Sequence, residues 1–511
     1  SPARIWATLA GLWKSSPSTS GRPRRCAARA ATVDLPQPAT PITTRLTPSR
    51  IAAIAIGAGL SGHRQSPPTA AADDMSETAA IEAEVNPHYL DHLVAASASH
   101  EVEATEDIVT RSGVKLLARG ARIDATTRER LLAHKLSRPL EQCVGVSGGV
   151  TPEQIGQAAE RWLDEQPLLR ALCAEDRGLP LPRSLPRLRL SPGMQSLLRL
   201  YAQRQADRLH HAVGVALVAK ALARRLLPGD VDQHRRIGLA GLLHDVGELY
   251  LDPGHLQRGA PLQAEQWRQI VSHPVIGHRV LRDLDGGAAD LAELVLGHHE
   301  RLDGFGYPRG LQGEQFAVAT QTLAVAEWLT GLMDQGPAAN IHASIATKLI
   351  PGEFGEPALE LLRAAARASG TPPRLTETPG TLADALPQVL HVAEVLTRWR
   401  MVRGSFDVRL ALASPELRAL VALCRHRLQQ LQASFTSAGL DAGAPEQLVD
   451  ELADESPTLQ LELLSLIREF HWRIGEMERE VLLRTHQMSP DDQTLVHSMI
   501  AALKGSLPVA A

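Results

Sequence analysis

The spacing of apolar residues is the feature that most constrains the fold of this chain. From Ser191 almost to the C-terminus, apolar side chains recur at steps of three and four residues, which is the period of amphipathic α-helices. Aromatic residues make up only 3% of the sequence, so the 44% of hydrophobic residues are mostly leucine, alanine and valine, which favour packed helices. The sequence therefore predicts a mainly α fold and disfavours an all-β sandwich.

Two stretches near the C-terminus carry an apolar seam of nearly coiled-coil regularity. The first seam, between Leu459 and Val481, consists of Leu463, Leu466, Phe470, Ile474 and Met477. The second seam consists of Leu417, Leu420, Val421, Cys424, Leu428 and Leu431. Each seam requires a partner helix. An intramolecular bundle is favoured, and a homodimer through these C-terminal helices is the alternative.

Changes in composition divide the chain into five segments. Residues 1–74 are rich in Pro, Ser, Thr and Arg and poor in acidic residues, which predicts disordered sequence or an upstream extension. An Arg-rich targeting peptide is the alternative for this segment. We expect a small α+β N-terminal module over residues 75–177, a Pro-rich linker over 178–192, a helical domain over 193–385 and a C-terminal helical region over 386–511.

The α+β expectation depends on a short alternating segment and the start of a helix. Apolar and polar residues alternate from Ile108 to Ile123 around two glycines, as in a small hairpin. A helix is expected to follow, with Thr126 as its N-cap and Glu129 completing a capping box.

Charge and cysteine usage exclude several classes of partner and compartment. The formal net charge is -4, which provides no basic field for a nucleic acid polymer or an anionic membrane. The four cysteines are scattered, so neither a disulfide scaffold nor a zinc knuckle is expected. The longest apolar run, Ile51 to Leu60, is far shorter than the roughly 20 residues that span a bilayer. We expect no membrane span and a cytoplasmic location.

Histidines are concentrated in one part of the predicted helical domain. Nine of the 20 histidines fall between His210 and His299, which is denser than core packing or solubility requires. Among them are His210, His211, His244, His273, His298 and His299. Imidazole nitrogens combined with a carboxylate suit Fe, Mn, Ni or Zn better than Mg or Ca.

The adjacent His244 and Asp245 indicate a pair of metal ions. Neighbouring residues on a helix point about 100° apart, so these two side chains cannot bind one ion as an i, i+4 pair does. The imidazole can bind one ion while the two carboxylate oxygens bridge that ion to a second. A lone histidine is more often a core or capping residue, and His210, His234, His255 and His278 are expected to be bystanders.

Two motifs resemble those of a known family. The text HDVG at residues 244–247, followed by HHERLDGFGYPRGL at 298–311, resembles the HD-GYP branch of the HD-domain metal-dependent phosphohydrolases. The likeness extends from about Leu197 to about Leu332. It implies a helical HD-domain core, cyclic di-GMP as the substrate and two divalent transition-metal ions. Fe or Mn is preferred for these ions, with Ni or Zn as alternatives.

The resemblance also implies roles for individual residues. The implied metal ligands are His211, His244, Asp245, His273, His298, His299 and Glu327, with Asp207 as a further candidate for a third ion. Asp245 is also implied as a catalytic residue because it would bridge the two ions. Asp303, Tyr307 and Arg309 of the glycine-rich loop are candidates for substrate binding. In the family, this loop also docks diguanylate cyclase domains, which implies a second kind of partner.

Two residues depart from the family's pattern. Glu327 replaces the usual aspartate, and its longer side chain is still expected to bind metal. Glu248 replaces a lysine that holds the substrate phosphate, which makes Glu248 a candidate catalytic group, as a metal ligand or proton acceptor. Otherwise it would repel the phosphate, because unit charges about 4 Å apart interact by about 4 kcal/mol at an effective dielectric of about 20.

These observations predict a metal-dependent phosphodiesterase that hydrolyses cyclic di-GMP through a metal-activated bridging hydroxide. The alternative is a degenerate HD-GYP domain, weakly active or inactive, that senses cyclic di-GMP or docks other proteins. Glu248 and Glu327 favour this alternative. An HD phosphohydrolase that acts on nucleotides is disfavoured, because such enzymes lack the GYP loop.

Overall fold

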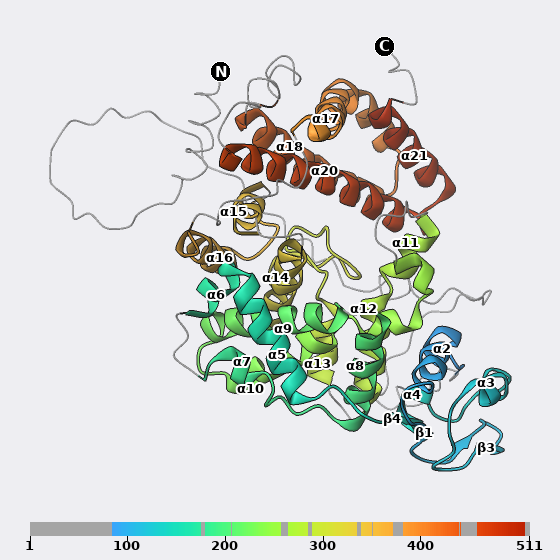
Figure 1. Ribbon diagram of the computed structural model, residues 1–511. Helices are drawn as coiled ribbons and strands as arrows, with labels where there is room; N and C mark the ends of the chain where they lie inside the picture. The colour runs from blue at the N-terminus through green and yellow to red at the C-terminus, as the bar shows by residue number, and fades with distance from the viewer. Residues whose placement is uncertain are drawn as a thin grey trace, which may run out of the picture.

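The computed structural model confirms a mainly α protein (Figure 1). It describes residues 84–174, 179–205, 207–256, 264–284, 289–334, 339–349, 351–370, 382–438, 440 and 457–505. The extension predicted over residues 1–74 lies outside the described residues. No helix in the described ranges is both long and apolar enough to cross a membrane.

The N-terminal part combines short strands with helices. β1 (Val102–Ala104) pairs with β4 (Val144–Val146), and β2 (Ile108–Val109) pairs with β3 (Lys115–Leu117), each pair antiparallel. The helices are α2 (Pro87–Ala96), α3 (Ala125–Leu132), α4 (Leu140–Cys143), α5 (Pro152–Glu165) and α6 (Pro167–Ala174). Val102 and Ala104 of β1 are buried in a hydrophobic core that continues into the helical domain.

The start of α3 differs from the predicted start. Asp124 is the N-cap, and its side chain accepts a hydrogen bond from the backbone N–H of Thr126. Thr127 completes the capping box by accepting a bond from the N–H of Asp124 at 3.0 Å. The prediction of Thr126 and Glu129 was therefore wrong by two residues, because aspartate is also a strong N-cap and precedes them.

The predicted Pro-rich linker is a packed part of the domain over residues 179–192. It contains α7 (Leu181–Ser184), and Leu181, Leu185 and Leu188 lie in the hydrophobic core. Leu181 and Leu185 stand one helical turn apart, so both can point inward. The prediction of a linker was wrong here because it weighed the prolines and not the leucines between them.

The helical domain is built around a central helix, α9 (Arg208–Leu226), whose residues from Ala212 to Ala223 are all buried. Its remaining elements are α8 (Pro192–Arg204), α10 (Val231–Leu243), η2 (Val246–Tyr250), η3 (Pro253–Leu256), α11 (Ala264–Ile270), α12 (His273–Asp283), α13 (Ala289–Leu296), η5 (Gly313–Gln315), α14 (Val318–Met333), α15 (Ala339–Leu349) and α16 (Glu356–Ala368). α10 and α14 both pack on α9, and they also contact each other.

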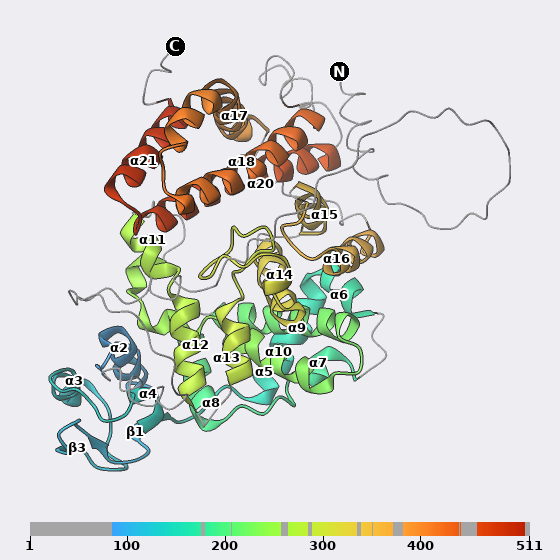
Figure 2. The same ribbon diagram turned by 180° about the vertical axis from the view of Figure 1, so that it is seen from behind.

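The C-terminal helices form a layer beside this domain (Figures 1 and 2). They are α17 (Leu382–Leu410), α18 (Pro415–Ser437), α20 (Pro457–Thr485) and α21 (Pro490–Lys504). The seam from Leu463 to Met477 is buried against α17 and α18, and α20 also contacts α11 and α15. The first seam is therefore packed within one chain, as an intramolecular bundle requires.

Candidate metal centre

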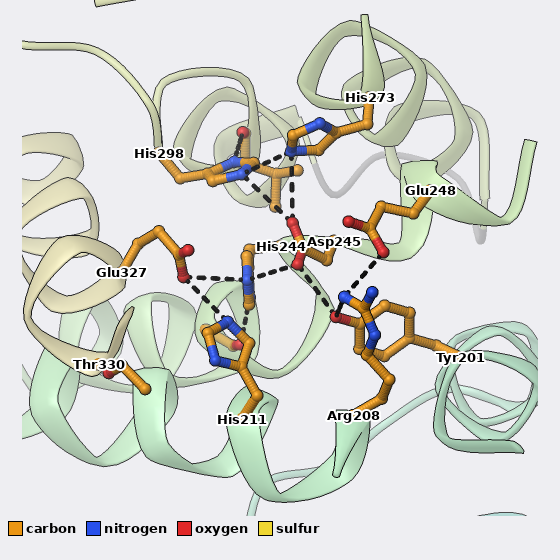
Figure 3. Close-up of polar contacts among 12 residues, drawn as sticks. Tyr201, Arg208, His211, His244, Asp245, Glu248, His273, His298, Glu327 and Thr330 are labelled. Atoms are coloured by element: carbon orange, nitrogen blue, oxygen red, sulfur yellow. Dashed lines mark hydrogen bonds and ion pairs between the residues drawn. The ribbon is translucent and has the colours of Figure 1, made fainter. Parts of the chain in front are cut away.

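The ends of several helices bring the predicted ligands together (Figure 3). His211 lies in the first turn of α9, and His244 and Asp245 lie between α10 and η2. His273 is the first residue of α12, and His298 and His299 follow the end of α13. Glu327 projects from α14 toward His211 and His244. Side chains at helix ends can converge on one point because the chain turns there.

Asp245 is shared by two groups of donor atoms. Asp245, His273, His298 and His299 each offer one donor, and these atoms all lie within 4.8 Å of one another. A second group, with the same spacing, consists of His211, His244 and Asp245. A carboxylate shared by two such groups is suited to bridge two ions.

The two oxygens of Asp245 face different histidines. Oδ2 lies 3.2 Å from Nε2 of His244, and Oδ1 lies 3.3 Å from Nε2 of His273. On the first side, Glu327 Oε2 lies 3.2 Å from Nε2 of His244 and 3.3 Å from Nε2 of His211. Glu327 therefore reaches the centre, as its longer side chain was expected to allow.

Backbone carbonyl groups orient three of the rings. Nδ1 of His244 lies 2.9 Å from the oxygen of Gly241, and Nδ1 of His273 lies 2.7 Å from that of Ile270. His298 makes the same contact with Val295 at 2.5 Å. Because a carbonyl oxygen only accepts, each Nδ1 donates a proton to it, which turns each Nε2 toward the centre.

Burial and neighbouring charges shift the pKa values of the cluster in different directions. Burial acts to raise the pKa of Asp245, but contacts with His244, His273 and His298 hold that pKa well below its usual range. Burial acts to lower the pKa of His211, but Glu327 and Asp334 raise it to about 10. Burial lowers the pKa of His298 to about 4. Metal ions bind ionised carboxylates and neutral imidazoles, so an ion bound at His211 would displace the proton from that ring.

Two buried atoms lack a satisfactory partner. Nε2 of His244 and Oε2 of Glu327 are fully buried, and neither makes a hydrogen bond of acceptable geometry with the residues that the structure describes. A buried polar atom without a partner is costly, and a dication between these two atoms would remove that cost. The donor set of imidazoles and carboxylates likewise fits a transition metal.

Gly247 allows η2 to approach α12. A Cβ at this position would lie 2.1 Å from the backbone oxygen of His273, whose ring contacts Asp245. Gly247→Ala is therefore expected to displace His273, to reduce the metal content and to destabilise the fold by about 1–3 kcal/mol. Elemental analysis and thermal unfolding measure these two effects.

Gly331→Ala is the matched control for this prediction. Gly331 lies in α14, one turn after Glu327, and a Cβ there would meet no atom within 4 Å. Alanine in a helix is expected to stabilise by about 0.5–1 kcal/mol and to leave the metal content unchanged. Equal losses of metal in the two variants would refute the role given to Gly247.

Two predicted residues lie outside the cluster. Asp207 is exposed at the N-cap of α9 and belongs to neither group of donors. Its shorter side chain, at a position where the helix begins, does not reach the centre. Glu248 is buried in η2, where its Oε2 lies 3.1 Å from Nη1 of Arg204 and 3.0 Å from Nη1 of Arg208. Glu248 therefore pairs with two arginines, one from α8 and one from α9, and belongs to neither group of donors.

The three predicted substrate contacts have different surroundings. Tyr307 stacks on His299 with ring centroids 4.7 Å apart, so it lies at the centre. Arg309 lies 3.1 Å from Glu293, and its backbone N–H donates to Glu300 at 2.6 Å. Asp303 accepts from the N–H of Phe305 and pairs with Arg427 at 3.0 Å. The structure does not bring Asp303 to the centre, because its carboxylate is occupied by these contacts.

Three residues near the centre were not predicted from the sequence. Tyr201 donates a hydrogen bond to Oδ2 of Asp245 at 3.0 Å, and Arg208 donates to the Tyr201 hydroxyl at 3.3 Å. Asp334 lies 2.9 Å from Nδ1 of His211. Asp334 follows Glu327 by seven residues, or two helical turns, and this spacing could have indicated it.

The C-terminal layer holds the glycine-rich loop over residues 303–310. Besides its pair with Asp303, Arg427 of α18 lies over the ring of Phe305 at 4.6 Å. Arg484 of α20 donates to the carbonyl oxygens of Gly304 and Gly306 at 2.5 and 2.9 Å. Two helices distant in the sequence thus fix the loop that carries Tyr307.

Comparison with known proteins identifies the domain that carries this centre. The family model of the HD domain matches residues 194–352. A 3′3′-cGAMP-specific phosphodiesterase of Vibrio cholerae is 27% identical over 216 residues, covering 40% of this chain and 46% of that protein. A cyclic di-GMP phosphodiesterase of Pseudomonas aeruginosa is 34% identical over 151 residues, covering 29% of this chain and 36% of that protein.

A third relative is named as a response regulator. The cyclic di-GMP phosphodiesterase response regulator of Xanthomonas campestris is 31% identical over 132 residues, covering 26% of this chain and 33% of that protein. The chain therefore spans less than half the length of each of these three relatives. With its HD pair at residues 244–245 and its GYP loop at 303–310, the chain contains an HD domain of the HD-GYP family over residues 194–352.

Proposed function

We propose that this protein is a metal-dependent phosphodiesterase that hydrolyses cyclic di-GMP. The observation that carries the proposal is the carboxylate of Asp245, whose two oxygens face separate groups of histidines. Relatives of this chain are named as phosphodiesterases of cyclic di-GMP or of 3′3′-cGAMP. Both compounds are cyclic dinucleotides, so the comparisons support this class of substrate.

The residues of the centre would hold two divalent transition-metal ions. His211, His244 and Glu327 would hold one ion, and His273, His298 and His299 the other, with Asp245 contacting both. Fe or Mn is proposed for both positions, because imidazole and carboxylate together suit them. When bound, the two ions would lower the pKa of a water molecule and neutralise charge on the phosphoryl oxygens.

Hydrolysis then requires little covalent chemistry from the protein itself. The oxygen of water bonds to phosphorus and loses a proton, the bond from phosphorus to the 3′ oxygen breaks, and that oxygen takes up a proton. The product of one such step is a linear dinucleotide, and a second step releases GMP. Tyr307, stacked on His299, borders the centre and can orient the substrate by packing or through its hydroxyl.

Chromatography of a reaction mixture tests the proposal. Metal-loaded protein is incubated with cyclic di-GMP and, in parallel, with 3′3′-cGAMP, and the linear dinucleotide and GMP are followed over time. Formation of the linear product from cyclic di-GMP supports the proposal. Binding of cyclic di-GMP without cleavage would indicate the alternative of a sensor, and cleavage of 3′3′-cGAMP alone would reassign the substrate.

A further inference from the structure

Arg208 connects directly to the proposed bridging carboxylate. Its Nη1 donates a hydrogen bond to the hydroxyl of Tyr201 at 3.3 Å, and Tyr201 donates to Oδ2 of Asp245 at 3.0 Å (Figure 3). The direction of these two hydrogen bonds is fixed, because a guanidinium only donates and an ionised carboxylate only accepts. A permanent positive charge therefore lies beside the centre.

The charges of the group containing Arg208 do not cancel. Arg204 and Arg208 both contact the same oxygen of Glu248, at 3.1 and 3.0 Å. Two guanidinium groups and one carboxylate leave at least one positive charge in excess. The sequence has the acidic Glu248 where the family has a lysine. In the structure, Arg204 of α8 and Arg208 of α9 supply positive charge beside Glu248.

The two arginines face different surroundings. The side chain of Arg204 is only 8% exposed, and together with burial its charge lowers the pKa of His92 in α2 to about 4. The charge of Arg204 therefore affects the N-terminal module, which contains α2 and His92. The side chain of Arg208 is 18% exposed and lies near Asp245, whose negative charge stabilises the guanidinium cation. Arg208 donates through Nε to Gln205 and through Nη1 to Tyr201, and its Nη2 makes no hydrogen bond with the residues that the structure describes.

We propose that Arg208 binds a non-bridging oxygen of the substrate phosphate, with Glu248 and Tyr201 as the groups that hold its Nη1 in place. Nη2 of Arg208 remains available to such an oxygen, and a guanidinium suits a phosphate geometrically. This inference rests on the proposed function, because it assigns a contact within the same site. It also explains how the domain can bind a phosphodiester although residue 248 is acidic.

Arg204→Gln provides a matched control for Arg208→Gln. Both variants remove one of the two cations that contact Glu248, but only the second would remove a phosphate contact. For metal-loaded protein, titration calorimetry with inorganic phosphate should show that Arg208→Gln weakens binding about 10- to 100-fold, as expected when a charged hydrogen bond is lost. Arg204→Gln should change the affinity by less than about threefold, and Arg208→Lys should retain part of it.

Metal content and turnover complete the test. Arg208→Gln should keep the metal content of the unaltered protein and should lower kcat/KM for cyclic di-GMP by a similar factor. Equal losses of phosphate affinity in the two glutamine variants, an unchanged affinity in Arg208→Gln, or a loss explained by missing metal would each overturn the inference. If the unaltered protein binds phosphate through Arg208 but does not cleave cyclic di-GMP, the proposed function fails and the inference stands.

Discussion

Asp245→Ala is expected to lose more than one metal ion per chain and to lower the rate of cyclic di-GMP hydrolysis by about a thousandfold or more. Both groups of donors include this carboxylate, so its removal weakens both positions together. Stabilisation of transition-state charge by metal ions amounts to several kcal/mol, and each 1.36 kcal/mol is about a tenfold change in rate. Elemental analysis and chromatographic assays on the same sample measure the two effects.

His255→Ala serves as the control for Asp245→Ala. His255 lies in η3 and belongs to neither group of donors, although it is a histidine of the same domain. Its replacement should change neither the metal content nor the rate by more than about twofold. If Asp245→Ala retains the full metal content, Asp245 is not a ligand and the proposed arrangement of two ions is wrong.

Arg427→Met is expected to destabilise the protein by about 3–5 kcal/mol, which is the range for breaking a buried ion pair from one side. Arg427 is 1% exposed and contacts Asp303 at 3.0 Å, Glu476 at 2.7 Å and Glu353 at 3.3 Å. Methionine fills a similar volume but leaves these carboxylates without their shared cation. The midpoint of unfolding in guanidinium chloride measures the loss.

Arg425→Met is the control on the same helix. Arg425 lies two residues earlier in α18 and pairs with Asp407 at the surface, where such pairs contribute at most about 1 kcal/mol. Similar shifts of the unfolding midpoint in the two variants would show that the buried pairs of Arg427 contribute no more than a surface pair.

The residues that the structure brings together at the candidate centre could be picked out from the sequence because most of them stand in short contiguous motifs. His244 and Asp245 are adjacent, as are His298 and His299, so a few letters determine most of the donor set. The mainly α fold was likewise predictable, because the helical period persists over most of the chain. Apart from the predicted linker, which is packed in the domain, the domain boundaries remain predictions.

The surroundings of Glu248 could not be predicted in the same way. Arg204 and Arg208 lie about forty residues before Glu248, and their contacts depend on how α8 and α9 are oriented against η2. Arg427 was equally inaccessible to sequence reasoning, because arginines are almost never fully buried unless paired. Its partners come from the glycine-rich loop, from Glu353 and from α20, and no local pattern links these segments.

The contacts that α18 and α20 make with residues 303–310 restrict how another protein can dock on this loop. Arg427 and Arg484 already occupy Asp303 and the carbonyl oxygens of Gly304 and Gly306. A second protein that required these groups would compete with a tethered ligand whose effective concentration is of the order of millimolar. At micromolar concentration, that competitor would have to bind about a thousandfold more tightly than the chain's own helices. A diguanylate cyclase domain would therefore have access to this side of the loop only after the helices had released it.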